Sequence, residues 1–210
     1  MITYVHSNQI IKRLCIVLGF PGIAVFVLWK GIVPIDYNPL VLFMVFVVIG
    51  IRVCISIKNN QWPLQKTGFH RSNLTEGTVY YMALVGIGVI CFFCAHLVVP
   101  VRDQLVSWKF FVSVLVCTGM QQFLFSGYLI KEMRDIFSSR WVVCTIVVIF
   151  FTVAHVFFSR PEVILPATCL FSIILTPLYY SHPNYLLAWL THSIFNALAI
   201  YTKMFTPIWV

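Results

Sequence analysis

Long apolar stretches separated by short polar segments run along almost the whole chain. Stretches of this kind are typical of membrane-spanning helices, because about 20 apolar residues in helical form cross a bilayer. The pattern predicts an all-α, polytopic membrane bundle of about seven transmembrane helices. We expect these helices at residues 14–28, 39–57, 79–99, 108–130, 141–158, 163–180 and 185–201.

The composition agrees with a membrane protein and leaves no room for a separate soluble module. Of the 210 residues, 60% are hydrophobic and 10% are charged, with a mean hydropathy of +0.94, whereas a soluble domain has about 25% charged residues. We therefore predict one membrane domain over residues 1–210. The net charge of +8 indicates contact with anionic membrane lipid at the helix ends and no role in nucleic-acid binding.

The distribution of basic residues predicts the orientation of the multi-pass chain. With the N-terminus in the cytoplasm and seven crossings, the cytoplasmic side holds most of the 14 lysines and arginines. Such an excess marks the cytoplasmic face of membrane proteins, so we expect the C-terminus on the other side. The cytoplasmic set is Lys12, Arg13, Arg52, Lys58, Lys66, Arg71, Lys131, Arg134 and Arg140.

The seven cysteines lie within the apolar stretches and give no disulfide framework. Cys91 and Cys94 form a C-x-x-C pattern close to His96, which could indicate metal or redox chemistry. Inside an apolar helix, however, two small sulfur side chains are more often packing residues. We expect no cofactor from this pattern.

Three of the predicted helices carry polar residues in their apolar interior. Gln121 and Gln122 interrupt the run 116–130, His155 lies in the run 141–158, and His192 and Asn196 lie in the last run. Polar side chains inside a bilayer need partners within the protein. The three groups therefore predict one shared site between three helices, open towards one leaflet.

Two of these groups resemble motifs of the CPBP (Abi) family, the CAAX-type intramembrane proteases. That family carries Phe-x-x-x-His followed by His-x-x-x-Asn. Phe151 and His155 match the first of these motifs, and His192 and Asn196 match the second. Residues four apart share a helix face, so each pair points to one side.

The family's remaining motif, Glu-Glu-x-x-x-Arg, is degenerate in this chain. Gln121 and Gln122 stand at the two glutamate positions, and Ser126 stands at the arginine position. The surrounding residues 123–129, Phe-Leu-Phe-Ser-Gly-Tyr-Leu, still resemble the family's pattern. The resemblance covers about residues 115–200, which we take as the family-like core.

The resemblance implies roles for these positions in peptide hydrolysis. The family's glutamate at position 121 and the histidine at His155 activate water. The histidine and asparagine at His192 and Asn196 stabilise the oxyanion. The second glutamate and the arginine, at the positions of Gln122 and Ser126, support the site and position the substrate.

A general base is missing from this version of the site. A glutamine side chain does not accept a proton near neutral pH, and Glu132 and Asp135 lie at the helix exit, about 15 Å or more from Gln121 along the axis. A positioned base contributes about 10² to 10⁴ in rate. We therefore predict a weak or inactive endopeptidase that binds a membrane protein or a C-terminal peptide as substrate or client.

Three other interpretations remain open at this point. The natural protein could be an active protease with glutamates at 121 and 122, although Ser126 argues against a designed replacement. A divergent enzyme could use His155 as its base, with a metal at His155 and His192. A small transporter or channel subunit is the third, but the predicted helices hold no central charge and the chain shows no inverted repeat.

Overall fold

The computed structural model describes residues 15, 19, 38–59, 61–98, 108–156 and 161–201. These residues are helical or lie in turns and short connections, so the predicted all-α class is confirmed for them. The segment predicted as a first helix, 14–28, lies almost entirely outside them. The helices are α2 (Asn38–Lys58), α3 (Thr78–Val98), α4 (Trp108–Gln122), the π-helix η4 (Phe123–Leu129), α5 (Ile130–Ile136), α6 (Arg140–Val153), α7 (Pro161–Ser181) and α8 (Tyr185–Tyr201).

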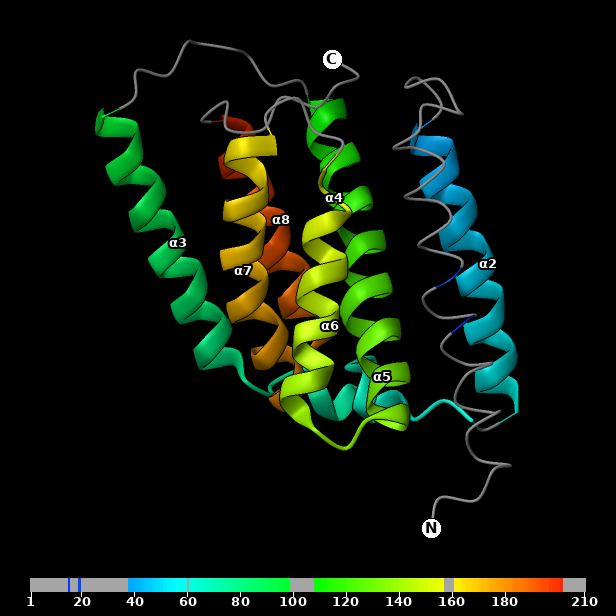
Figure 1. Cartoon of the computed structure of the whole chain (residues 1–210). Coiled ribbons are helices and arrows are strands. Elements are labelled where there is room, and N and C mark those ends of the chain that lie inside the picture. The colour runs from blue at the N-terminus through cyan, green and yellow to red at the C-terminus, as the bar shows by residue number, and fades with distance from the viewer. Residues whose placement is uncertain are drawn as a thin grey trace.

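The helices form a bundle in which α4, α6, α7 and α8 run side by side, with α2 and α3 on opposite flanks (Figure 1). The closest packing is between α6 and α7, between α4 and α8, and between α3 and α8. The last helix of the chain thus lies between two earlier ones. This arrangement brings the predicted polar groups of α4 and α8 face to face.

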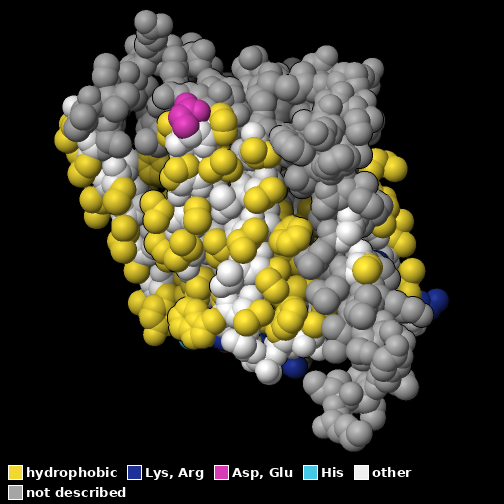
Figure 2. Space-filling model, viewed as in Figure 1, with side chains coloured by type: hydrophobic (Ala, Val, Ile, Leu, Met, Phe, Trp, Pro, Cys, Tyr) yellow, Lys and Arg dark blue, Asp and Glu magenta, His cyan; other side chains and the backbone are white. Residues whose placement is uncertain are grey.

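The described side chains on the face seen in Figure 2 are mostly apolar. Within the described residues, Pro161–Ser181 is the one helix that is long and apolar enough to cross a membrane, and the bent pair Leu64–Asn73 and Thr78–Cys94 supplies a second if it is counted as one span. Helix α6 and most of α8 are apolar but shorter. The predicted topology of seven crossings stays a prediction.

Helix α4 continues further than predicted. The helical path runs from Trp108 through the π-helix η4 and α5 to Ile136 without a break, whereas the sequence predicted an end near Ile130 and a charged exit. Ion pairs stabilise the added turns, because the Lys131 Nζ lies 3.0 Å from Glu132 Oε1 and 2.8 Å from Asp135 Oδ2.

Helix α6 is shorter than predicted and ends at Val153, so His155 lies in the following turn and not inside a helix. The Nδ1 atom of His155 lies 2.7 Å from the carbonyl oxygen of Phe151. A helix leaves its last carbonyls without partners, and the imidazole supplies one here. The side chain itself therefore stabilises the helix end.

The connection between α2 and α3 is an ordered structure with two short 3₁₀ turns, Leu64–Thr67 and Arg71–Asn73. It is bound to the turn between α7 and α8. The Tyr185 amide donates to the Gly68 carbonyl at 3.2 Å, and the Asn184 side-chain amide donates to the carbonyls of Leu74 and Glu76 at 3.0 and 3.2 Å. Gly68 has φ +72°, and a Cβ there would lie 2.7 Å from the Tyr185 nitrogen, so the contact requires glycine.

The same connection buries Trp62. Trp62 is 6% exposed, and its ring stacks on that of Tyr128 with the centroids 5.9 Å apart. The Lys131 ammonium lies 4.9 Å from the Trp62 ring. This part of the connection therefore packs against the end of η4 and the start of α5.

Candidate active site

Helix α8 is held along α4 by hydrogen bonds from aromatic side chains to backbone carbonyls. The Trp189 indole donates to the Leu115 carbonyl and the Tyr185 hydroxyl donates to the Gly119 carbonyl, both at 2.9 Å. A Cβ at Gly119 would lie 3.0 Å from the Trp189 Nε1. The absence of a side chain at Gly119 thus lets the two helices approach closely and fixes their register.

The centre of this seam is the buried amide of Gln122, which is 1% exposed. Its Nε2 donates to the Ser126 Oγ at 2.5 Å, and its Oε1 lies 3.3 Å from the His192 Nδ1. Because an amide oxygen only accepts hydrogen bonds, the proton lies on the His192 Nδ1. Gln122, Ser126 and His192 therefore form one network of neutral groups.

A second link joins the same two helices one turn away. The Asn196 Nδ2 donates to the Thr118 Oγ1 at 3.2 Å, and the Thr118 hydroxyl donates to the Val114 carbonyl at 2.6 Å. Thr118 and Gln122 are four residues apart, and each bonds to a side chain of α8. Sequence reasoning missed Thr118, although its position four residues before Gln122 could have indicated it.

His155 is 2% exposed and approaches this network through Phe151. The Phe151 ring centroid lies 4.7 Å from that of the His155 imidazole and 5.3 Å from that of His192. Since a carbonyl accepts only, the bond to Phe151 puts a proton on the His155 Nδ1. In the neutral ring the basic nitrogen is then Nε2.

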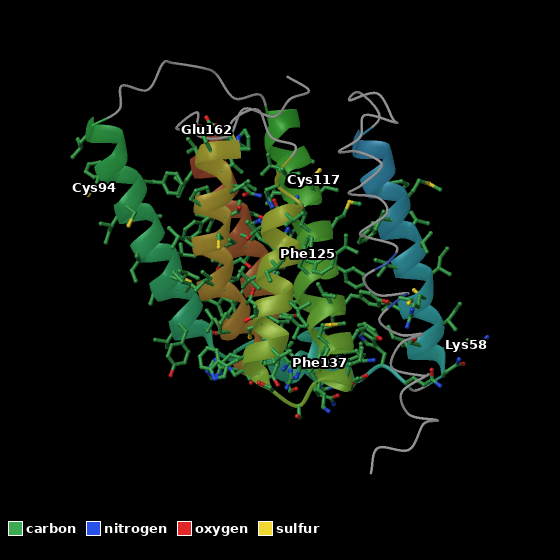
Figure 3. The ribbon with its side chains drawn as sticks, viewed as in Figure 1. Lys58, Cys94, Cys117, Phe125, Phe137 and Glu162 are labelled. Carbon is green, nitrogen blue, oxygen red and sulfur yellow. The ribbon has the colours of Figure 1, made fainter. Side chains whose placement is uncertain are left out.

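The π-helix η4 adds an aromatic wall to the site. Phe125, labelled in Figure 3, lies with its ring centroid 5.2 Å from that of Phe151 in an edge-to-face contact. A π-helix replaces the usual hydrogen bond to the fourth preceding residue by one to the fifth, and such segments often lie at functional sites. Here it follows directly after Gln122 and contains Ser126.

His192 and Asn196 also face a cavity of about 60 Å³ between α3, α6, α7 and α8. Its walls are mostly aromatic and aliphatic, so these two side chains and Thr168 provide its polar groups. The cavity is lined by Phe92, Phe151, Val163, Ile164, Ala167, Thr168, Phe171, His192, Phe195, Asn196 and Ala199. The predicted i, i+4 pair on α8 therefore does present two polar groups to one space.

Gln121 differs from the other residues that the sequence singled out. It is half-buried, and it makes no hydrogen bond with any of them in the described part of the chain. The glutamine that enters the network is its neighbour, Gln122. Adjacent helical positions point about 100° apart, so only one of the two amides can face α8.

The described residues contain no group of three or more His, Cys, Asp or Glu side chains that could hold a metal ion. Cys91 and Cys94 are exposed on α3 as free thiols. The side chain of His96 lies outside the described residues. His155 and His192 are linked through Phe151, and no third ligand joins them among the described side chains.

Comparison with known proteins agrees with this geometry. Residues 103–198 match the family model described as type II CAAX prenyl endopeptidase Rce1-like. This core of the chain is Rce1-like. The match contains Gln121, Gln122, Ser126, His155 and His192, together with Asn196, so the family recognised from three short motifs is confirmed. No curated protein and no solved structure matches the chain.

Proposed function

We propose that the chain is a multi-pass membrane protein whose Rce1-like site binds a membrane peptide or protein and cleaves it weakly or not at all. The family match supports a protease-like site. The proposal of weak or absent cleavage rests on the buried amide of Gln122, which is hydrogen-bonded to both Ser126 and His192. The position that holds a carboxylate in the resembling family holds a satisfied neutral group here.

The distribution of charge supports a membrane location with the N-terminus in the cytoplasm. Every lysine and arginine with a described side chain belongs to one end of the bundle, formed by the end of α2, the connection to α3, α5 and the start of α6. Figure 2 shows apolar side chains over the face between this basic end and an acidic side chain at the opposite end. An apolar belt with one basic rim is typical of membrane proteins that follow the positive-inside rule.

Hydrolysis of a peptide needs a base to take a proton from water and donors to hold the oxyanion. Asn196 has one amide hydrogen on Thr118 and a second that can serve as such a donor. The glutamate base of the resembling family is missing at Gln121, and the buried acid Glu132 is paired with Arg52 and Lys131. Loss of a positioned base lowers the rate by about 10² to 10⁴.

The amide at Gln122 also removes a function from His192. The Nδ1 proton of His192 is directed at Gln122, so Nε2 of the neutral ring has no proton to donate to an oxyanion. A carboxylate at this position would accept the same bond and stabilise the doubly protonated ring, which has a proton on both nitrogens. The amide at Gln122 thus affects the oxyanion donor, and the amide at Gln121 removes the base.

A peptidase assay in proteoliposomes tests this proposal with a prenylated C-terminal peptide and a membrane-protein substrate. We expect no turnover by the chain, but saturable binding of the peptide, measured by photocrosslinking and by competition with unlabelled peptide. The comparison protein carries Gln121→Glu, Gln122→Glu and Ser126→Arg. Turnover by this variant, abolished by His192→Ala, would support the assignment of the remaining residues.

Three results would contradict the proposal. Clear turnover by the unmodified chain that His155→Ala abolishes would favour the alternative of an active enzyme with His155 as base, for which the basic Nε2 set by the Phe151 bond is the supporting observation. Absence of specific peptide binding would exclude the binding function. Recovery of the protein in the soluble fraction after alkaline extraction of membranes would exclude the membrane location.

A further inference from the structure

Two arginines share one aromatic ring at the basic end of the bundle, where α5, α6 and α7 meet. The guanidinium carbon of Arg134 lies 4.3 Å from the centroid of the Tyr180 ring, and that of Arg140 lies 5.8 Å from the same centroid. The face of an aromatic ring attracts a cation. Two cations at one ring nevertheless repel each other, so the arrangement favours an anion between them.

No carboxylate fills this place among the described residues. Glu132 is paired with Arg52 at 3.6 Å and with Lys131 at 3.0 Å, and the Asp135 carboxylate lies 2.8 Å from the Lys131 Nζ. Neither Arg134 nor Arg140 has an ion pair in the described part of the chain. The two acids of α5 are therefore paired with other cations.

The hydrogen bonds of the two arginines point to the same conclusion. The Nη1 atom of Arg134 is buried and has no hydrogen-bond partner in the described structure. A buried donor without an acceptor is unfavourable, so an acceptor from outside the chain would stabilise it. Arg140 uses Nη2 to donate to the Pro177 carbonyl at 3.2 Å, which holds its guanidinium group beside Tyr180.

The start of α6 adds further positive potential. Its N-cap residue, Ser139, makes no side-chain capping bond to the first turn, and residues 138–140 are exposed. The first turn of a helix presents unpaired N–H groups and the positive end of the helix dipole. Together with the two arginines, this end of α6 has the chemistry that binds phosphate groups.

The surroundings indicate which phosphate compound fits. Trp141 is 72% exposed beside Arg140, and exposed tryptophan is typical of the membrane–water interface. From there Val142, Ile149 and Val153 form an exposed apolar stripe along one face of α6. A phosphate at the arginines would thus have an apolar path for acyl chains directly above it.

We propose that Arg134, Arg140 and the first turn of α6 bind the phosphate of an anionic phospholipid, with its acyl chains along the stripe of Val142, Ile149 and Val153. Arginine suits this role because its planar group donates two parallel hydrogen bonds to a phosphate. The inference rests on the membrane location proposed above and not on the state of the catalytic site.

The experiment uses the full chain purified in a neutral detergent and titrated with short-chain phosphatidylglycerol, with phosphatidylcholine and inorganic phosphate as separate arms. Binding is followed by the rise in unfolding temperature and by native mass spectrometry of bound lipid. We expect saturable binding of phosphatidylglycerol, weaker binding of phosphatidylcholine, and a loss of affinity on the order of tenfold in Arg140→Gln. Arg71→Gln is the matched control, because Arg71 is an exposed arginine at the same end of the bundle.

Each outcome decides the proposal. An equal loss in Arg71→Gln and Arg140→Gln means that general charge attracts the lipid and overturns the site, as does the absence of any preference for phosphatidylglycerol. If inorganic phosphate binds as tightly as phosphatidylglycerol, the site binds phosphate, but the proposal that its ligand is a phospholipid is wrong. Arg134→Gln removes a packed side chain and can affect folding, so Arg134→Lys is measured beside it. Lysine keeps the charge but cannot donate two parallel hydrogen bonds. Full affinity for the lipid in Arg134→Lys would contradict the proposed role of the arginine geometry.

Discussion

Two polar regions of this protein differ in the groups that form them. The seam between α4 and α8 uses the neutral groups of Thr118, Gln122, Ser126, His192 and Asn196. The region at the basic end is ionic, formed by Arg52, Lys131, Glu132 and Asp135. Among the described residues the one buried carboxylate is Glu132, and it lies beside two cations at the basic end of the bundle.

Under the membrane location proposed above, the energetics of charge in a bilayer explain this difference. A carboxylate at the centre of a bilayer costs about 2.5–3.5 kcal/mol on insertion scales. At the basic end, Glu132 is only 4% exposed, but two cations and the nearby water–membrane boundary offset its desolvation. The resembling family has glutamates at the positions of Gln121 and Gln122, where this chain has amides.

The largest expected effect comes from breaking the ionic region. In Glu132→Ala, Lys131 keeps only its ion pair with Asp135, and Arg52 loses its ion pair with Glu132. Removal of one member of a buried ion pair costs about 3–5 kcal/mol. We expect the free energy of unfolding in mixed micelles to fall by about 3 kcal/mol. The control is Glu162→Gln, an exposed acid at the start of α7, and an equal effect in both variants would refute the special role of Glu132.

The second prediction places a charge in the neutral seam. In Gln122→Glu the new carboxylate keeps the acceptor for His192 but is desolvated, so we expect a loss of about 2.5 kcal/mol in unfolding free energy. Gln121→Glu is the matched control, because Gln121 is half-buried and outside the network; its effect should be clearly smaller. Adding Ser126→Arg to Gln122→Glu should recover part of the loss by pairing the charge, and a further decrease would contradict this view.

The polar residues of the seam could be predicted because they break an apolar pattern. His192 and Asn196 stand out in the sequence, and their spacing of four placed them on one face, as the shared cavity shows. The same reasoning could not choose between Gln121 and Gln122, since that choice depends on the rotation of α4 against α8. The rotation is set by Trp189 and Tyr185, whose bonds to α4 carbonyls leave no mark in a hydropathy pattern.

The ends of the helices were harder to predict than their existence. His155 was placed inside a helix because the apolar run continues to Phe158, but its side chain binds the Phe151 carbonyl and the helix stops at Val153. The connection 61–77 lies between two predicted helices, and its order could not be predicted because its partners Asn184 and Tyr185 are more than 100 positions away. Such long-range bonds are decided by the fold and not by local sequence.

The third prediction removes the acceptor at the lower end of the seam. In Ser126→Ala the Nε2 of Gln122 loses its hydrogen bond inside the protein, and an unsatisfied buried donor costs about 1–3 kcal/mol. We expect a decrease of about 2 kcal/mol in unfolding free energy. Ser126→Thr keeps the hydroxyl and serves as control. Equal stability of Ser126→Ala and the unmodified chain would mean that another group, or water, satisfies the amide.

The smallest loss of unfolding free energy is expected at Thr118. Its size allows the hydrogen bond of Asn196 to be compared with that of Gln122. Thr118→Val keeps the shape of the side chain but removes the acceptor of Asn196. Asn196 is half-buried at the cavity, unlike the fully buried Gln122, so water can take over part of the lost bond, and we expect about 1 kcal/mol or less. Thr118→Ser, which keeps the hydroxyl, separates the hydrogen bond from packing. A loss in Thr118→Val as large as in Ser126→Ala would show that the cavity is dry at Asn196, and the second amide hydrogen of Asn196 would then have to be directed at a substrate group and not at water.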